Sequence, residues 1–530
     1  MQNKDEDLQL IKHLSYKGID DKMVMGHPAA LFVLFFTEMW ERFSYYGMRA
    51  LLTVFLITEI ARGGWEWSNA DAMKLFAWYT GLVYLTPLLG GIIADKLTGY
   101  RKAITIGALV MTLGHIAMAL EIFHNNFFFA GLVLMILGNG LFKPNISSMV
   151  GQLYPDTSTK KDAGYTIFYM GINAGAFLGM LLCGYIGEKV GWHYGFGLAG
   201  VFMMFGMFQF YFGRKIFGTV GEDPTRESTV VVAESEEEEE EETPSHIVRD
   251  RLIVIGVLMF ASLFFFFAFE QAGGSMTIFA KDYTQRMLTG NAGAIFKWVD
   301  AGLTVFPIII VTYVLFHLSR KIFKQYPLTI IFTAVSFAII WGIGIWKVGR
   351  EFSLEQTEVT VSWFQILNSF FIITLASSFS KLWEKKWNPS GPVKFAMGLA
   401  LVGIGFVVLA YGARIIPAGA EPGTIRVGMI WLILAYFFHT MGELCLSPVG
   451  LSYVSKLSPK KLLGLLFGFW FCASAIANFI GGFLGSTIDK ITTEHSMSYF
   501  FMIFAIIPGV TALLLILLNP ILKKMMHGIN

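Results

Sequence analysis

Hydrophobic residues occur in long runs along most of the chain, and short polar segments separate them. Fourteen runs are long enough to form a helix that crosses a bilayer, which takes about 20 mostly apolar residues. They lie at roughly 28–58, 71–94, 103–122, 127–153, 163–186, 192–213, 251–279, 296–317, 327–347, 361–383, 393–413, 427–454, 462–488 and 498–522. The pattern predicts an all-α integral membrane protein with fourteen transmembrane helices.

The polar segments indicate the topology. Residues 1–27 are mixed in charge and unlike a cleavable signal peptide, so we expect a cytoplasmic N-terminal tail. Residues 216–248 include the acidic run from Glu236 to Glu242, and we expect a disordered cytoplasmic linker there. Lys and Arg are concentrated in the loops that would face the cytoplasm, and residues 523–530 form a second tail on that side. The positive-inside rule therefore favours a multi-pass cell (inner or plasma) membrane protein with both termini in the cytoplasm.

Composition excludes several classes of protein. Hydrophobic residues make up 55% of the chain and charged residues only 15%, whereas a soluble domain carries about 25% charged residues. Mean hydropathy is +0.59 and the net charge is +2. These values exclude a soluble enzyme, a disordered chain and a nucleic-acid binder. The 3 cysteines exclude a disulfide framework and a Cys-rich metal site.

The two halves of the chain show a weak internal repeat. Glu38 in the first span and Glu270 in the first span after the linker are 232 positions apart, whereas Lys143 and Glu443 are 300 apart. The difference of 68 is the length of two spans with their loops. We therefore expect two six-helix bundles, 28–215 and 249–280 together with 361–522, and an accessory helix pair inserted at 281–350. Repeats of this kind place a binding site at their interface, near the bilayer midplane.

Charged residues lie inside several spans, where each costs about 2.5–3.5 kcal/mol to insert. Together they indicate a polar cavity. On the first span, Glu38 and Arg42 are one helical turn apart and can form an ion pair. Since arginine stays charged, a proton that arrives there must bind a glutamate. The charged positions away from the span ends are Glu38, Glu41, Arg42, Arg49, Lys143, Glu270 and Glu443.

Lys143 and Glu443 are natural partners. Lys143 lies mid-span beside Pro144, and the repeat places Glu443 at the corresponding depth. A bridge between them could break and re-form as the two halves rock. The seven mid-span charges comprise three cations and four carboxylates, so one added proton makes their sum zero. We hypothesise that proton binding and the binding of a zwitterionic ligand are coupled.

Uncharged polar and small residues inside the spans are less specific. Tyr169 and Asn173 are one turn apart, and Tyr84, Asn368 and Trp470 lie within other apolar runs. Each alone is more typical of helix packing than of a ligand contact. The four-residue repeat of Gly171, Gly175 and Gly179 predicts close helix packing.

The first-span string from Glu38 to Gly47 reads EMWERFSYYG, and the string from Phe168 to Gly179 reads FYMGINAGAFLG. Both resemble specific signature motifs of the proton-dependent oligopeptide transporter family of the major facilitator superfamily. The loop string GGIIADK, which continues to Arg101, is shared by the wider superfamily. The strings FKPN, which contains Lys143, and GELCLSPVG, which contains Glu443, are similar to the family's fourth and tenth core helices.

The resemblance implies a major facilitator fold and alternating access. It also implies proton-coupled symport of di- and tripeptides, with no enzymatic activity, no metal, no cofactor other than the proton and a monomer sufficient for transport. The implied proton-coupling residues are Glu38, Glu41, Arg42 and Glu270. The implied substrate-binding residues are Arg49 and Lys143 for the peptide carboxylate, Asn173, Asn368 and Glu443 for the amine, and Tyr45, Tyr46, Tyr84, Tyr169, Ser447 and Trp470 for the lining. The implied gating salt bridges are Lys143–Glu443 and Arg49–Glu270, and the implied conformational loop contains Asp95 and Arg101.

The chain departs from the family pattern in two places. The accessory pair follows the Glu270 helix instead of separating the two halves, and Phe266 stands where many relatives have tryptophan. Another major facilitator cargo, such as nitrate, an amino-acid conjugate or a drug, remains the nearest alternative. Nitrate needs no amine-binding carboxylate, so Glu443 weighs against it. An intramembrane protease would need paired mid-span aspartates, and ATP-driven transport would need a phosphate loop; the sequence contains neither.

Overall fold

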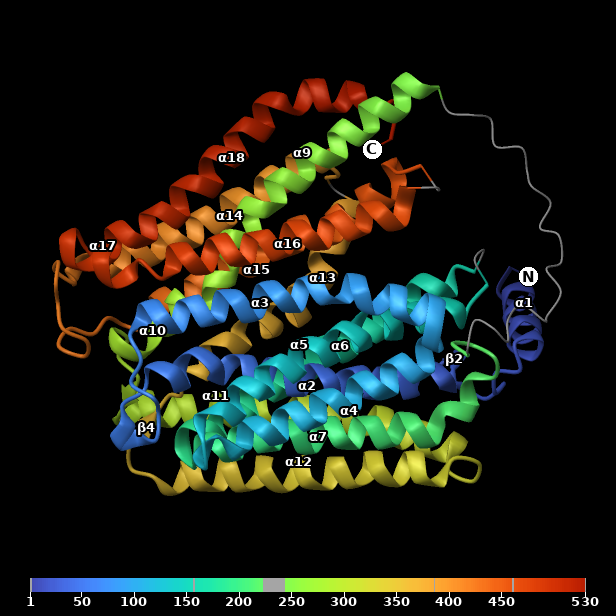
Figure 1. Ribbon diagram of the computed structural model, residues 1–530, viewed down its shortest axis with the longest axis horizontal. Coiled ribbons are helices and arrows are strands. Elements are labelled where there is room, and N and C mark those ends of the chain that lie inside the picture. The colour runs from blue at the N-terminus through green and yellow to red at the C-terminus, as the bar shows by residue number, and fades with distance from the viewer. Residues whose placement is uncertain (1, 156–157, 223–243, 386, 460–461, 530) are drawn as a thin grey trace. The chain divides into compact units, whose positions relative to one another are not determined.

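The computed structural model describes residues 2–155, 158–222, 244–385, 387–459 and 462–529, and within them the regular structure consists of helices and two small sheets (Figure 1). Twelve helical stretches of these residues are long and apolar enough to cross a membrane. One of them, Asn69–Ile122, contains both α3 (Asn69–Ile93) and α4 (Gly99–Ala119). Helix α2 (Ala29–Ile57) is as long but carries the charged residues of the first span. Each of the fourteen predicted spans therefore corresponds to a helix, and the predicted fold class is confirmed.

The helices form two compact units. Unit 1 comprises Met1–Leu51, Thr86–Val231 and Met287–Trp363. Its long helices are α1 (Gln2–Tyr16), most of α2, the end of α3, α4, α5 (Asn125–Gln152), α6 (Lys160–Lys189), α7 (Trp192–Gly213), α11 (Gly290–Ile322) and α12 (Pro327–Ser353). Its short elements are the π-helix η2 (Ala94–Thr98), η3 (Leu120–Ile122), η4 (Arg214–Phe217), and the antiparallel pairs β1 (Met23–Val24) with β2 (His27–Pro28) and β3 (Met287–Leu288) with β4 (Thr357–Glu358). The 3-10 helix η6 (Ser362–Gln365) lies where unit 1 ends.

Unit 2 comprises Leu52–Leu85, Val232–Arg286 and Phe364–Asn530. Its elements are η1 (Ile60–Arg62), the first part of α3, α9 (Ser245–Phe269), η5 (Glu270–Gly273), α10 (Ser275–Asp282), α13 (Ile366–Lys385), α14 (Gly391–Gly412), η7 (Ala413–Ile415), α15 (Ile430–Leu457), α16 (Leu463–Gly485), α17 (Ile488–Glu494) and α18 (Met497–Met525). Helix α14 packs against both α15 and α18, and α9 packs against α16.

The two units differ from the expected bundles at two segments. Residues 52–85 belong to unit 2, because the first half of α3 packs tightly on α16; a methyl group added at Gly482 would lie 2.3 Å from the Ala77 side chain. The accessory helices belong to unit 1, because Phe337 of α12 packs edge-on against the rings of Phe36 and Trp40 of α2. Side-chain packing, not order along the chain, determines these groupings.

Both expected cytoplasmic segments contain helical residues. Within residues 1–27, helix α1 buries Leu10 and Leu14, and the His13 ring hydrogen-bonds the Gln152 carbonyl oxygen at 3.1 Å. The expected linker at 216–248 begins with the end of η4 and ends within α9, which starts at Ser245. The acidic run from Glu236 to Glu242 lies outside the described residues.

The glycine repeat of α6 lets this helix approach α2 closely, as predicted. A methyl group added at Gly175 would lie 2.1 Å from the Met39 carbonyl oxygen, and one added at Gly179 would lie 2.2 Å from the Phe43 carbonyl oxygen. Both neighbours are backbone atoms of α2, which cannot move aside as a flexible side chain could. The backbone that carries the α2 charges is therefore held directly against α6.

Replacing Gly175 with alanine is expected to destabilise the protein, because overpacking a well-packed contact costs about 1–3 kcal/mol. Gly349 of α12 is the matched control, since an added methyl group there meets nothing within 4 Å. Gly349→Ala should be neutral or slightly stabilising, because glycine in a helix costs roughly 0.5–1 kcal/mol relative to alanine. Thermal unfolding of the two purified variants in detergent measures the difference. Equal midpoints would show that α2 and α6 do not need this close contact.

Candidate functional site

The predicted charge cluster of α2 is formed around a single guanidinium group. The Arg42 Nε atom lies 2.6 Å from a Glu38 carboxylate oxygen and 3.0 Å from a Glu41 carboxylate oxygen. All three side chains are buried, with residue exposures of 4%, 1% and 0% respectively. One arginine therefore holds two carboxylates, and the three groups carry one excess negative charge. A single proton can neutralise this excess.

A residue on α5, Asn139, completes this cluster. Its side-chain amide donates a hydrogen bond of 2.9 Å to Glu41, on the carboxylate oxygen opposite the one near Arg42. Asn139 is itself buried. The sequence analysis missed it, although a signal was present: Asn139 lies one helical turn before Lys143 within an apolar run. The charge of Lys143 also acts on Glu41, so α5 contributes both an amide and a cation to the surroundings of this carboxylate.

Aromatic rings continue the polar face of α2. The rings of Tyr45 and Tyr46 meet edge-on with centroids 5.0 Å apart, and the Arg49 guanidinium lies 6.0 Å from the Tyr46 ring centroid. On α6, the Asn173 amide donates to the Tyr169 carbonyl oxygen at 3.0 Å, while the Tyr169 side chain is exposed. Unit 1 therefore carries the predicted cations and four of the predicted polar lining residues.

Unit 2 carries the predicted mid-span carboxylates that lie outside α2, Glu270 and Glu443. The Asn368 side-chain amide donates to Glu443 at 2.8 Å and to the Thr440 hydroxyl at 3.2 Å. Glu270 begins η5 at the end of α9, is buried, and its charge acts on Glu443. Asn368, Glu443 and Glu270 thus form one polar group. Thr440 was not predicted, although it lies one turn before Glu443 on α15.

The remaining predicted lining residues of unit 2 differ in exposure. Trp470 is buried and packs against Gly450 and edge-on against Phe395, with ring centroids 6.3 Å apart. Tyr84 and Ser447 are half-buried on α3 and α15.

The predicted conformational loop contains η2 and the beginning of α4. The Arg101 Nε atom donates to the Val220 carbonyl oxygen at 2.6 Å, and its Nη1 lies 3.5 Å from a Glu222 oxygen. A second guanidinium nitrogen donates to the Gly218 carbonyl oxygen. Asp95 is exposed. Arg101 therefore holds residues 218–222, the segment that follows α7, by hydrogen bonds and an ion pair. The motif alone does not specify this role.

The described residues were also compared with the requirements of a metal site. Among the residues that the structure describes, no group of three or more His, Cys, Asp or Glu side chains could hold a metal ion. The candidate site does contain carboxylates, which can bind protons, and Arg and Lys, which can pair with charged groups.

The long apolar helices of the described residues, together with the buried ion pairs of α2, define a multi-pass membrane protein. A family model described as the POT family matches residues 101–234 and 329–503, more than half of the chain. The chain is 33% identical over 531 residues to the "Uncharacterized transporter YclF" of Bacillus subtilis (strain 168), covering 97% of this chain and 98% of that protein. It is also 33% identical to a "Di-/tripeptide transporter" of Lactococcus lactis subsp. cremoris, covering 95% and 98%. The chain belongs to the POT family and is a transporter, not an enzyme.

Solved structures agree with this assignment. The crystal structure of a peptide transporter POT in complex with sulfate has a TM-score of 0.74 and 29% identity, covering 98% of this chain and 99% of that chain. A POT family transporter in complex with a thioalcohol-conjugated peptide has a TM-score of 0.74 and 26% identity, covering 97% and 100%. The similarity extends over nearly the whole length of both chains.

Proposed function

We propose that this protein is a proton-coupled symporter that imports di- and tripeptides by alternating access. The observation that carries the proposal is the buried cluster of Glu38, Glu41 and Arg42, in which one guanidinium faces two carboxylates. Charged groups inside a membrane are costly to bury, and those that occur there usually mark a functional site. A relative named a di-/tripeptide transporter, 33% identical over nearly the full length, supports peptides as the cargo.

The proton-binding groups are the carboxylates of this cluster together with Glu270. Arginine does not release its proton, so Arg42 holds the carboxylates in place and opposes their charge. Asn139 holds Glu41 from the other side. Uptake of one proton removes the excess charge of the cluster, and the proton is the coupling ion.

The peptide's two charged ends call for opposite charges. Arg49 and Lys143 supply cations for the peptide carboxylate. Asn173, Asn368 and Glu443 supply acceptors for the amine, and the hydrogen bond between Asn368 and Glu443 orients that carboxylate. Tyr45, Tyr46, Tyr84, Tyr169, Ser447 and Trp470 line the site, where aromatic surface accommodates side chains of different shape.

Alternating access requires interactions that exchange during the transport cycle. The proposed gating pairs are Lys143 with Glu443 and Arg49 with Glu270. The loop that contains Asp95 and Arg101 would change its contacts as the transporter opens and closes. We further propose that the protein resides in the cell membrane with both termini in the cytoplasm, and that a monomer in the lipid bilayer is sufficient for transport.

Uptake of labelled dialanine into proteoliposomes, with and without an inward proton gradient, tests the proposal. We expect gradient-dependent uptake that excess unlabelled dipeptide blocks and that Lys143→Ala abolishes. Lys143→Ala removes a cation whose charge acts on Glu41 and that is proposed to bind the peptide carboxylate. Folded wild-type protein without uptake under either condition would contradict peptide symport.

A second candidate is transport of another small zwitterion. A POT family transporter with a TM-score of 0.75 and 25% identity has been solved in complex with 5-aminolevulinic acid, which carries an amine and a carboxylate. Competition by 5-aminolevulinic acid against dialanine distinguishes a site selective for peptides from one that accepts both. Nitrate has no positive end for Glu443 and should not compete.

A further inference from the structure

The accessory insertion begins and ends in one small sheet. Its first strand, β3, pairs antiparallel with β4, and the register places Met287 opposite Glu358 and Leu288 opposite Thr357. Both strands belong to unit 1 together with α11 and α12, whereas the residues directly before Met287 and directly after Trp363 belong to unit 2. The chain therefore enters and leaves unit 1 close to this sheet.

The last turns of α6 hold the exit of the insertion. The Glu188 carboxylate accepts hydrogen bonds from the backbone N–H groups of Val361 and Ser362 at 2.8 and 2.9 Å, and from the Ser362 hydroxyl at 2.7 Å. One turn earlier, a methyl group added at Gly184 would overlap the Ser362 side chain, which is fully buried. Hydrogen bonds to a charged acceptor are stronger than those between neutral groups. Helix α6 therefore fixes the backbone at Ser362.

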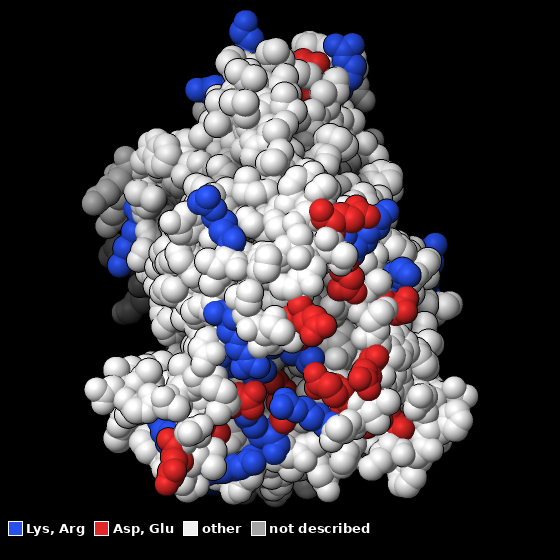
Figure 2. Space-filling view, turned by 90° about the vertical axis from the view of Figure 1, so that its left-hand side faces the viewer, with Lys and Arg blue, Asp and Glu red and all other residues white. Residues whose placement is uncertain are grey.

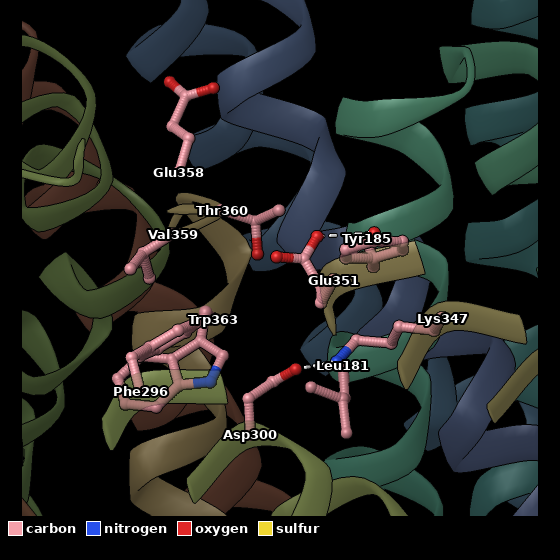
Figure 3. Close-up of a pocket in the computed structure, with 10 residues that line it drawn as sticks. All are labelled: Leu181, Tyr185, Phe296, Asp300, Lys347, Glu351, Glu358, Val359, Thr360 and Trp363. Atoms are coloured by element: carbon pink, nitrogen blue, oxygen red, sulfur yellow. Dashed lines mark hydrogen bonds and ion pairs between the residues drawn. The ribbon is translucent and has the colours of Figure 1, made fainter. Parts of the chain in front are cut away.

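Further side chains of α6 hold the sheet and the end of α12. Lys189 forms an ion pair of 2.7 Å with Glu358 of β4. The Tyr185 hydroxyl donates to Glu351 at 2.6 Å (Figure 3), and Arg350 donates to the Lys189 carbonyl oxygen at 3.2 Å. All of these residues belong to unit 1. We call the four contributing residues of α6 the α6 anchor: Gly184, Tyr185, Glu188 and Lys189.

The entry crossing into unit 1 is one residue long. On the unit 2 side, the Gln285 N–H group donates to the Val427 carbonyl oxygen at 2.8 Å. On the unit 1 side, Met287 is paired with Glu358. Arg286 is the single residue between these two held positions. Because an extended chain spans at most about 3.3–3.6 Å per residue, the two sides cannot separate far at this point.

The exit crossing is two residues long. Ser362 is held by the α6 anchor, whereas the side-chain amide of Gln365 donates to the Thr277 hydroxyl of α10, in unit 2, at 3.2 Å. Trp363 and Phe364 lie between them. Both belong to η6, the short 3-10 segment that leads into α13. A 3-10 stretch at the end of an α-helix has weaker hydrogen-bond geometry and often marks a hinge.

We propose that Arg286 and the pair Trp363–Phe364 are two hinges of the transport cycle, and that Glu188 is the residue that positions them on α6. Hinges usually consist of a few such loop or element-terminal residues. The accessory helices then convert the connection between α10 and α13 into a tether on unit 1. The inference rests on the proposed alternating access, and it requires the α6 anchor to stay closed throughout the cycle.

The α6 anchor can be reached from solvent. Figure 1 labels β4, which contains Glu358, at the left-hand end, and Figure 2 views that end, with acidic and basic side chains interspersed over its lower part. The side chains of Lys189 and Glu358 have exposures of 17% and 31%. Reagents in solution can therefore reach this ion pair.

A cross-link across the anchor tests whether it stays closed. Lys189→Cys with Glu358→Cys introduces two thiols at the ion pair, in a variant in which Cys183, Cys445 and Cys472 are replaced by alanine. A short bifunctional thiol reagent then links the two introduced cysteines. We expect the linked protein to take up dialanine in proteoliposomes at the same rate as the same variant before linking. Uptake that stops on linking would overturn the proposal, because the anchor would then have to open during the cycle.

Glu188→Gln tests the positioning role. Glutamine offers one acceptor oxygen in place of two, so the N–H group of Val361 or Ser362 loses its acceptor. We expect the turnover of dialanine counterflow to fall about tenfold, while its KM stays that of the wild type because the proposed binding residues keep their contacts. Linking the two introduced cysteines in the same variant should restore turnover. The exposed control Glu355→Gln should change neither quantity. Unchanged turnover, or a change in KM alone, would overturn the role of Glu188.

Spin labels on the same two introduced cysteines give a test that needs neither transport nor a change at Glu188. We expect a single spectrum with strong dipolar broadening, with and without dialanine and at acidic and neutral pH, because the labels stay close together. A second component without broadening would show an anchor that opens, and would overturn the proposal whatever the cargo. Absence of dialanine uptake by the wild type contradicts peptide symport instead, so the two failures are distinguishable.

Discussion

Glu41→Gln is expected to reduce proton-driven accumulation of dialanine strongly while peptide exchange without a gradient continues. Glutamine keeps the size and the hydrogen-bonding capacity of the side chain but cannot take up a proton. The Glu41 carboxylate is fully buried and lies between Arg42 and Asn139, so its protonation changes the charge of the whole cluster. Coupling between two binding events is typically about 1–3 kcal/mol, so gradient-driven uptake should fall roughly 5- to 150-fold.

Two assays on the same proteoliposomes separate coupling from folding and binding. Gradient-driven uptake measures coupling, and counterflow of labelled against unlabelled dialanine measures binding and alternating access. Glu355→Gln removes an exposed carboxylate and should leave both unchanged. If Glu41→Gln accumulates dialanine as the wild type does, the proton binds elsewhere, and Glu270→Gln becomes the variant to measure next.

The helices could be predicted from the sequence because the bilayer imposes a length on each one. A run of about 20 apolar residues has few alternatives to a spanning helix. The contact between Arg42 and Glu38 was also predictable, since residues one turn apart are neighbours on any helix. Helix α1 was not predicted, because residues 1–27 are polar and only Leu10 and Leu14 of α1 mark a buried face.

Contacts between distant segments could not be predicted in the same way. Asn139 and Glu41 are 98 positions apart, and nothing in the spacing of one helix shows which neighbour faces it. The grouping of α11 and α12 with unit 1 follows from contacts such as that of Tyr185 with Glu351, which are 166 positions apart. Family motifs supplied part of this information: Asn368 and Glu443, assigned together by resemblance, form a hydrogen bond in the structure.

Arg42→Gln is expected to destabilise the protein more than any single change in the glutamates beside it. The substitution leaves Glu38 and Glu41 buried without the cation that both contact. Breaking a buried ion pair by removing one partner typically costs about 3–5 kcal/mol, because the other charge stays behind in a poorly solvated place. Thermal unfolding of the purified variant in detergent measures the loss.

The combined variant Glu38→Gln, Glu41→Gln and Arg42→Gln tests whether uncompensated charge is the cause. It removes both carboxylates together with the guanidinium, and replacing a whole buried ionic group by neutral side chains is often tolerated. We therefore expect the triple variant to regain much of the stability that Arg42→Gln loses, yet to remain inactive in gradient-driven uptake because no carboxyl of the cluster is left. If the triple variant unfolds as early as Arg42→Gln, the guanidinium stabilises α2 through its packing, and its charge is not what the two glutamates require. Recovery of stability without recovery of uptake would instead separate the two roles of the cluster: Arg42 keeps the carboxylates inside the membrane, and the carboxylates bind the proton.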